Sequence, residues 1–422
     1  MNSISDNTKA ILLLTAPLIV SQKAQPAKIL SLKDYNLLAR ALKTMGLQPQ
    51  NLLGADSLDI LSELPSSFDV AKLESLLGRG FLLGQALTEW QRRSIWVVSR
   101  ADTAYPRRLK GHLREQSPPI LYGCGDRALL DEGGLAVVGS RKISDWLKNY
   151  TENLGALAAE AGVAIVSGAA RGIDSSAMGG ALMQEGKVIG VMADSLSRAA
   201  LAKSNREALQ NGRLVLISAY DPFAGFNVGH AMQRNKAIYA LADAGLVVSS
   251  DFNKGGTWAG ATEQLDKLHY APVFIREGKE SGQGSSALIQ RGGKTWPEPA
   301  TAEELLSIIE NASSCAANQT EQEEFMLGVN ENAVNYTKVG AGIRSNDAEP
   351  SKSTAMDSAE CLLQAVSGIL REALRKPKSG DEVAELLQVS KAQANKWLKR
   401  LVEDGQIRKL SKPVRYQSTT GQ

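Results

Sequence analysis

The segment LAVVGSRKISDWLKNYTENLGALAAEAGVAIVSGAARGIDSSAMGGAL, residues 135–182, decides the fold. It contains two short apolar runs, residues 135–138 and 163–166, with a stretch of helical character between them. Each run ends in a turn rich in glycine and hydroxyl residues. This order is typical of a β-strand, a helix and a second, parallel β-strand. The sequence therefore predicts a βαβ unit with a glycine turn after each strand.

Both turns have the composition of a phosphate-binding site. The first amide groups of a helix have no partner within the helix, and small residues let an anion approach them. Arg141 and Arg171 add a fork of charged donors, one to each turn. Tight turning alone would also explain the glycines, but two such turns on neighbouring strands, each with an arginine, favour phosphate binding. The turns are Gly139-Ser140-Arg141 and Ser167-Gly168-Ala169-Ala170-Arg171-Gly172-Ile173-Asp174.

Further apolar runs alternate with helical stretches up to about residue 297. Short apolar runs separated by helices predict an α/β fold with a doubly wound parallel sheet that is covered on both faces. In such sheets ligands bind at the carboxyl ends of the strands. The additional runs are residues 188–192, 214–217, 244–248 and 272–275.

Two more cationic segments lie near these strand ends. The segment KGGTWAGA follows the run at 244–248, and its first residues suit a helix N-terminus that faces phosphate. The segment QRNK lies in or near the preceding helix; a solvated surface is the simpler use of its charges, but its place between phosphate-type turns favours binding. The candidate residues are Lys254, Gly256 and Thr257 in the first segment and Arg234 and Lys236 in the second.

Composition limits the possibilities. A chain of 422 residues predicts two or three domains, and the formal net charge of +3 says little about nucleic acid. The apolar run at residues 11–14 is too short for a membrane span or a signal peptide. Neither a metal nor a cofactor is expected, and a reducing cytoplasm is the natural setting, because the cysteines are widely separated and odd in number. They are Cys124, Cys315 and Cys361.

The chain divides into four predicted regions. Residues 1–92 form a helical N-terminal module, which serves either DNA-backbone contact or packing and oligomerisation. Residues 93–310 form the α/β core. Residues 311–358 are rich in Asn, Ser, Ala, Glu and Thr and predict a flexible linker. Residues 359–422 form a C-terminal domain.

The C-terminal region has the pattern of a winged helix. Three helical stretches precede two short strands, residues 407–410 and 414–416. The third helix begins at Ser390, with Gln393 completing a capping box. In such domains this helix reads DNA, and contact with a protein is the alternative use. Its candidate DNA-binding residues are Lys396, Lys399 and Arg400.

These motifs together resemble the DNA-processing protein A (DprA/Smf) family over roughly residues 95–293. The run S-G-x-A-x-G-I-D at residues 167–174 is the strongest element. Four positions depart from the family pattern and favour a divergent member: Met178, Ala219, Ser250 and Gly255 stand where His, an acidic residue, Glu and Ser are usual. The other matching elements are Tyr105-Pro106 with Leu109, Val138-Gly139-Ser140-Arg141, Arg234-Asn235 with Ile238, residues 254–261, and Leu288-Ile289 before Gly292-Gly293.

The resemblance implies an extended Rossmann-like core that binds single-stranded DNA in a basic pocket, forms a homodimer and helps to load a RecA-type recombinase. It implies phosphate contacts from Arg141, Arg171, Arg234, Lys236 and Lys254. Backbone or hydroxyl donors would come from Gly139, Ser140, Ser167, Gly168 and Gly256. Such binding is dominated by charge and depends on salt.

Other functions stay open at this point. A divergent member could be a regulator or an antitoxin that neutralises a cognate toxin in phage defence. A nucleotide-hydrolysing enzyme is the other alternative, because Gly255-Gly256 with Glu263 partly matches the G-G-x-G-T-x-x-E turn of phosphoribohydrolases. Glu263 is one residue out of register with that motif, and the aspartates after three strands, Asp194, Asp221 and Asp251, are not paired by any motif. We therefore expect a protein that is not an enzyme.

Overall fold

The computed structural model of the chain describes residues 4–19 and 28–312, together with residues 374, 379, 382–383, 398, 407–410 and 415–418. The chain divides into two compact units, Met1–Glu331 and Asn332–Gln422. The first unit contains a group of N-terminal helices and an α/β core. The second contains a short β-hairpin.

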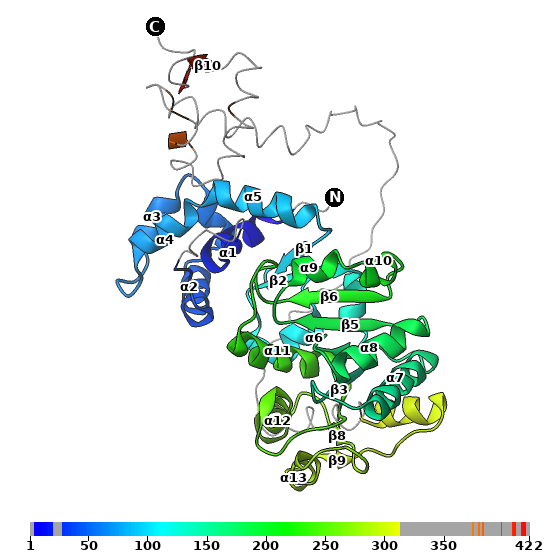
Figure 1. The fold of residues 1–422 in the computed structure, drawn as a ribbon. Helices are drawn as coiled ribbons and strands as arrows, with labels where there is room; N and C mark the ends of the chain where they lie inside the picture. Colours follow the sequence, from blue (N-terminus) through cyan, green and yellow to red (C-terminus); the bar gives the residue numbers. More distant parts are fainter. Residues whose placement is uncertain are drawn as a thin grey trace, which may run out of the picture. The chain divides into compact units, whose positions relative to one another are not determined.

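A nine-stranded sheet forms the centre of the first unit (Figure 1), in the order β1-β2-β6-β5-β4-β3-β7-β8-β9. The strands from β6 to β9 in this order are parallel, whereas β2 is antiparallel to both of its neighbours, β1 and β6. The predicted α/β fold with a doubly wound parallel sheet is confirmed for β3 to β9, and the structure adds an antiparallel pair, β1 and β2, at one edge. The strands are β1 (Trp96–Ser99), β2 (Ile120–Gly125), β3 (Leu135–Val138), β4 (Ile165–Ser167), β5 (Val188–Met192), β6 (Leu214–Ser218), β7 (Ala244–Val247), β8 (Val273–Ile275) and β9 (Lys294–Thr295).

Helices connect the strands and cover the sheet (Figure 1). A further helix covers residues 302–312, so that the first two residues of the predicted linker are helical. Short 3-10 turns lie at Arg114–Gln116 and Arg127–Asp131, and a π-helical turn at Gln264–Leu268 follows α12. The main helices of the core are α6 (Arg107–Leu113), α7 (Asp145–Glu160), α8 (Ile173–Met183), α9 (Leu196–Ala200), α10 (Lys203–Gln210), α11 (Val228–Leu241), α12 (Gly255–Glu263) and α13 (Gly284–Gln290).

The two faces of the sheet bury alternate residues of each strand. In β3, Leu135 and Val137 belong to the hydrophobic cluster that includes α7 and α8. Ala136 and Val138 belong to the opposite cluster, which includes α6 and α11. Successive side chains of a strand point to opposite faces, so a strand that is buried on both faces is apolar throughout. This burial explains why the strands are continuous apolar runs in the sequence.

The N-terminal helices pack around the first of them, α1 (Asp6–Thr15). Its segment from Ile11 to Leu14 is at most 3% exposed. A helical stretch without a polar face is typical of a helix that is surrounded by protein. The serine at its N-cap, Ser5, accepts a hydrogen bond from the backbone amide of Thr8 at 3.1 Å. The other elements of this N-terminal group are α2 (Leu32–Thr44), a 3-10 turn at Pro49–Leu53, α3 (Ser57–Ser62), α4 (Val70–Leu77) and α5 (Gly80–Gln91).

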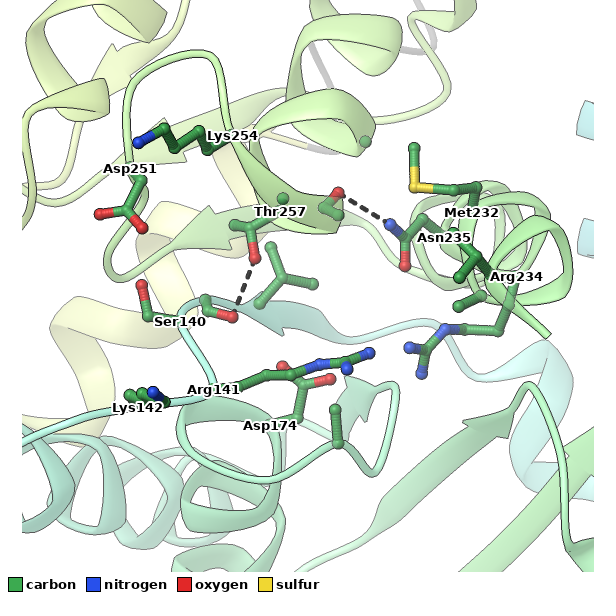
Figure 2. Close-up of a pocket in the computed structure, with 18 of the residues that line it drawn as sticks. Ser140, Arg141, Lys142, Asp174, Met232, Arg234, Asn235, Asp251, Lys254 and Thr257 are labelled. Atoms are coloured by element: carbon green, nitrogen blue, oxygen red, sulfur yellow. Dashed lines mark hydrogen bonds between the residues drawn. The ribbon is translucent and has the colours of Figure 1, made fainter. Parts of the chain in front are cut away.

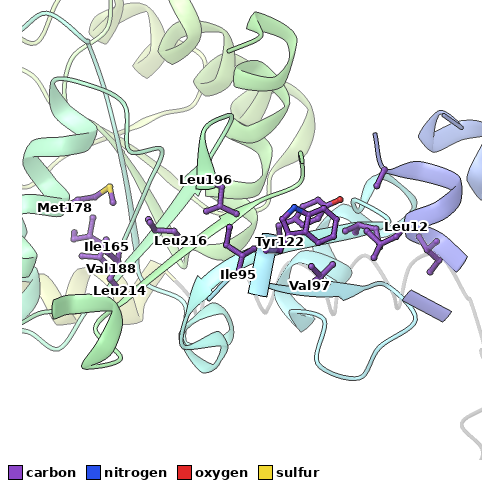
Figure 3. Close-up of a cluster of buried hydrophobic side chains, with 14 of the residues drawn as sticks. Leu12, Ile95, Val97, Tyr122, Ile165, Met178, Val188, Leu196, Leu214 and Leu216 are labelled. Atoms are coloured by element: carbon purple, nitrogen blue, oxygen red, sulfur yellow. The ribbon is translucent and has the colours of Figure 1, made fainter. Parts of the chain in front are cut away.

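One hydrophobic core joins these helices to the edge of the sheet. Leu12 of α1 belongs to the same buried cluster as Val97 of β1 and Tyr122 of β2 (Figure 3). The Thr8 hydroxyl also donates a hydrogen bond to the Ser99 hydroxyl at 2.8 Å. The N-terminal helices therefore contribute to the core that supports the sheet.

In the second unit, β10 (Ile407–Leu410) pairs antiparallel with β11 (Arg415–Ser418), and Ile407 lies opposite Ser418. This pair agrees with the predicted hairpin, although the second strand begins one residue later. Most of the residues of the three helices predicted before it lie outside the described residues, and the winged helix stays a prediction. So do the predicted linker from residue 313 on and the candidate residues Lys396, Lys399 and Arg400.

Within the described ranges, the chain contains no helix with the length and apolar character that crossing a bilayer would require.

The shared core predicts that a cavity in α1 will destabilise the whole first unit. Leu12 is fully buried, and we expect Leu12→Ala to lower the free energy of unfolding by about 2–5 kcal/mol. Urea denaturation followed by tryptophan fluorescence measures this loss. Leu37, which is 44% exposed on α2, serves as the control, because Leu37→Ala should change stability by less than about 0.5 kcal/mol. Equal losses in the two variants would contradict the role assigned to α1.

Candidate nucleic-acid interface

A cavity of about 470 Å³ lies beyond the carboxyl ends of β3 and β7 (Figure 2). Its walls come from the turn after β3, from α11 and the loop before it, and from the start of α12. Its lining includes four cationic side chains and two carboxylates. These six residues are Arg141, Lys142, Arg234, Lys254, Asp174 and Asp251.

Close packing of the two glycine turns builds the floor of the cavity. A Cβ atom on Gly139 would lie 2.5 Å from Cγ1 of Ile173, and a Cβ atom on Gly172 would collide with the carbonyl oxygen of Ser140. Gly172 also has a φ of +86°, which side-chain-bearing residues rarely adopt. The Ile173 amide donates a hydrogen bond to the Ser140 carbonyl at 3.2 Å. Glycine at these positions therefore lets the two turns meet.

Arg234 is a buried arginine that holds the second turn in place. It is 8% exposed, and its guanidinium donates hydrogen bonds to the carbonyl of Gly168 and, at 2.9 Å, to that of Val191. Burial lowers the pKa of Arg234, the carboxylate of Asp174 raises it, and the nearby Arg141 lowers it. Figure 2 shows the Arg141 and Arg234 guanidinium groups pointing toward each other beside Asp174. The two like charges face a space that an anion could occupy.

Asp174 supplies the negative charge at the floor of the cavity. Its side chain is buried, and desolvation raises the pKa of the carboxyl from 3.8 to about 6. The neighbouring guanidinium of Arg234, the amides of Ala170 and Gly168, and Arg141 all oppose this shift in pKa. Near neutral pH the carboxylate offsets part of the surrounding positive charge.

The start of α12 forms the opposite wall. Lys254 is the N-cap residue, and Gly255 follows with a φ of +79°. The Thr257 hydroxyl donates a hydrogen bond to the Gly139 carbonyl at 2.8 Å, and the Asn235 side-chain amide donates one to the Gly256 carbonyl at 3.0 Å. These two bonds tie the N-terminus of α12 to the turn after β3 and to α11. The helix N-terminus, where unpaired amides favour anions, thereby lies at the cavity.

Seven of the predicted core site residues line this cavity. They come from three segments of the sequence that the parallel sheet brings to one edge. In the part of the chain that the structure describes, neither Arg141 nor Lys254 forms an ion pair with a carboxylate. The seven residues are Gly139, Ser140, Arg141, Arg234, Lys254, Gly256 and Thr257.

Four other predicted residues lie elsewhere. The buried Ser167 hydroxyl donates to the Val137 carbonyl at 2.6 Å, and the Gly168 carbonyl accepts from Arg234. Arg171 is exposed and does not line the cavity. Lys236 is engaged with Glu263, 3.1 Å from its Nζ, and with the side chain of Gln116 at 3.3 Å.

Among the lining residues that sequence reasoning missed are two exposed apolar side chains and one lysine. Phe226 and Val228 are 60% and 67% exposed and lie in the loop before α11 and at its start. The guanidinium carbon of Arg141 lies 5.8 Å from the centre of the Phe226 ring. Lys142 follows Arg141 directly and adds a charge to the same wall. In the sequence, Phe226 lies between Gly225 and Asn227. This composition is that of an ordinary loop and does not indicate a binding residue.

The N-terminal region supports this site through the shared core and through a polar contact with the loop before α11. The Ile19 amide donates a hydrogen bond at 3.1 Å to the carboxylate of Asp221, which lies in the loop that carries Phe226. The same carboxylate accepts from the Phe223 amide at 3.0 Å, and burial raises its pKa to about 6. Residues near the start of the chain therefore help to hold the loop that forms the apolar rim. In this respect the helical module belongs to the scaffold of the site.

The enzyme alternative receives no support from this geometry. Glu263 pairs with Lys236 and is not among the residues that line the cavity. Of the three strand-end aspartates, only Asp251 lines it. Over the described ranges, His, Cys, Asp and Glu side chains do not gather in any group of three that could hold a metal ion.

The surroundings of Asp174 predict a pH dependence with a defined sign. Because the folded-state pKa lies above the unfolded value, the folded chain holds this proton more tightly, and the group lowers stability as the pH rises from about 4 to about 6. We expect the Asp174 carboxyl to titrate near pH 6 in NMR spectra. Arg141→Ala should raise this pKa further, because it removes a cation that favours the ionised carboxyl. A pKa near 4 in the unsubstituted chain would contradict the buried placement of Asp174.

The chain is similar in sequence to known proteins. The family model described as "DNA recombination-mediator protein A" matches residues 96–308. The DNA processing protein DprA of Bacillus subtilis is 27% identical over 232 residues, which cover 53% of this chain and 75% of that protein. Protein Smf of Escherichia coli is 34% identical over 206 residues, which cover 46% of this chain and 51% of that protein.

The fold is shared with a solved structure. The X-ray structure of DNA processing protein A from Streptococcus pneumoniae has a TM-score of 0.51 at 24% sequence identity. The similarity covers 72% of this chain and 98% of that one. The family match extends over the whole α/β sheet and all the loops that line the cavity, and accounts for half of the residues. The chain therefore belongs to the DNA recombination-mediator protein A family.

Proposed function

We propose that this protein binds single-stranded DNA through the cavity at the carboxyl ends of β3 and β7, without acting as an enzyme. The observation that carries the proposal is the facing pair of guanidinium groups, Arg141 and Arg234, beside the N-terminus of α12. Like charges that face each other repel, and a phosphate between them removes the repulsion. Arg141 and Lys254 are available for this, because neither is paired with a carboxylate in the described ranges.

The rim of the cavity favours a single strand over an isolated phosphate. Phe226 and Val228 expose apolar surface next to the cations, and Arg141 approaches the Phe226 ring. Unpaired bases stack on exposed aromatic rings, whereas the bases of a duplex are covered by their neighbours. Cationic and aromatic groups side by side therefore match a chain of phosphates that carries exposed bases.

The cellular role that we propose follows from family membership. Because the family is described as recombination mediators, we propose that the protein supports DNA processing and recombination in the cytoplasm and hands its strand to a RecA-type recombinase. We further propose that it acts as a homodimer. Sedimentation velocity tests the dimer, and co-precipitation with a purified RecA-type recombinase, in the presence and absence of a single strand, tests the partner. A monomer that never retains the recombinase would overturn both, and would leave a cognate toxin as the partner to be tested.

The binding proposal predicts the effect of neutralising the cavity. Arg141→Ala and Lys254→Ala should each weaken binding of a labelled oligonucleotide, because each removes a cation that neutralises a phosphate. The plot of log K against log salt should become less steep by about 0.7 for each phosphate that is no longer neutralised. Fluorescence anisotropy across a salt series measures both quantities.

A matched control separates local from general charge effects. Arg40 is exposed on α2 and pairs with Glu115 at 2.6 Å, away from the residues that line the cavity. Arg40→Ala removes the same charge and should leave the affinity nearly unchanged. The proposal fails if Arg141→Ala binds as tightly as Arg40→Ala with the same salt dependence.

A further inference from the structure

A second groove, of about 480 Å³, lies where the end of α5 meets β2 and the pair α9 and α10. Its described lining carries three arginines and no carboxylate. We call this surface the arginine groove. The residues that carry its charge are Arg92, Arg93 and Arg206.

The arginine groove is separate from the cavity described above. None of its lining residues also lines that cavity. It includes Gly125, which lies opposite Val215 near the start of β6. The cavity, in contrast, lies beyond the last residues of β3 and β7, which run parallel to β6 through the sheet. The two sites therefore occupy opposite ends of the parallel strands.

The positive charge of the groove is only partly neutralised. Arg92 and Arg93 both pair with Glu89, each at 2.7 Å, so that two guanidinium groups share one carboxylate. Arg206 is exposed on α10, and no ion pair involves it in the described part of the chain. The Arg92 side chain is 63% exposed despite its pair. Arg92, just after α5, and Arg206, on α10, thus place exposed positive charge in the lining of the groove.

Arg93 gives the groove a fixed wall. Its guanidinium carbon lies 4.8 Å from the centre of the Phe223 ring, and its side chain also donates to the Glu89 carbonyl at 2.9 Å. An arginine held by a ring, a carboxylate and a carbonyl keeps its orientation when a ligand arrives. A positively charged surface that is already ordered loses less conformational entropy on binding.

We propose that the arginine groove is a second contact site for the phosphate backbone of single-stranded DNA. This inference rests on the proposed function, because the same polymer would occupy both sites. The planar guanidinium group of arginine matches the geometry of a phosphate. Because the groove lining contains no aromatic side chain on which a base could stack, contact there is with the DNA backbone and independent of base sequence. A strand long enough to leave the cavity would gain affinity from this site, and a short one would not.

The experiment compares two oligonucleotide lengths on the full chain. The short one has about 6 nucleotides, which lies within the site sizes usual for single-strand-binding proteins, and the long one has about 40, which exceeds them. In the variant Arg92→Glu with Arg206→Glu, affinity for the short strand should stay unchanged. Affinity for the long strand should fall about tenfold, and its salt slope should become about 1.4 less steep, as expected when two phosphates are no longer neutralised.

Two further variants make the result specific. The control variant, Lys33→Glu with Lys267→Glu, changes the net charge by the same amount as the double arginine variant, at exposed positions that line neither site. Its affinity for the long strand should stay within about twofold of that of the unsubstituted chain. Arg206→Glu alone preserves the Glu89 pairs and should produce about half of the change in slope. Thermal unfolding of each variant confirms that the chain is folded.

The outcomes distinguish this inference from the proposed function. If the double arginine variant binds the long strand as tightly as the lysine control does, the proposal of a second site is wrong. This conclusion does not depend on the result for the cavity variants. If Arg141→Ala leaves binding of the short strand unchanged, the proposed function is wrong. Loss of affinity for the long strand only, together with the smaller salt slope, supports the second site.

Discussion

The contact between two glycine turns is the constraint on which the site depends. Gly139 directly follows β3 and Gly172 is the N-cap residue of α8, and neither position has room for a side chain. Because the turns meet, Arg141 from the first and Asp174 from the second line one cavity. The buried guanidinium of Arg234 then fastens the second turn to β5 through two carbonyl groups. A larger residue at either glycine would separate the groups that make the site.

The charged groups at the floor of the cavity leave an excess of positive charge that favours an anion. Asp174 and Arg234 are both buried. Burial raises the pKa of Asp174 and lowers that of Arg234, so in each case it favours the neutral form. Each charge is retained because the other stands beside it, while Arg141 adds a positive charge that no described carboxylate pairs with. Electrostatic interactions are stronger in such a partly dehydrated space than in water. The site thus favours one additional negative group.

Much of the fold could be predicted from the sequence because its signals are local. The apolar runs marked the six parallel strands from β3 to β8 to within one or two residues, and the glycine turns marked where the chain leaves the sheet. The antiparallel direction of β1 and β2 could not be predicted, since strand direction is set by which neighbour a strand finds. The hydrophobic core that α1 shares with the edge of the sheet could not be predicted either, because Leu12 and Tyr122 are 110 residues apart in the chain.

The sequence by itself determined that phosphate-type turns follow several strands of a parallel sheet, because turn chemistry and strand periodicity are properties of neighbouring residues. Only the tertiary structure decided which cations share a cavity. Arg141, Arg234 and Lys254 meet there, whereas Lys236, two residues from Arg234, pairs with Glu263. Ser167 likewise bonds inward to Val137. The partner of a polar side chain depends on the order of the strands in the sheet and on the direction in which each helix face points. The spacing of residues in the sequence determines neither of these.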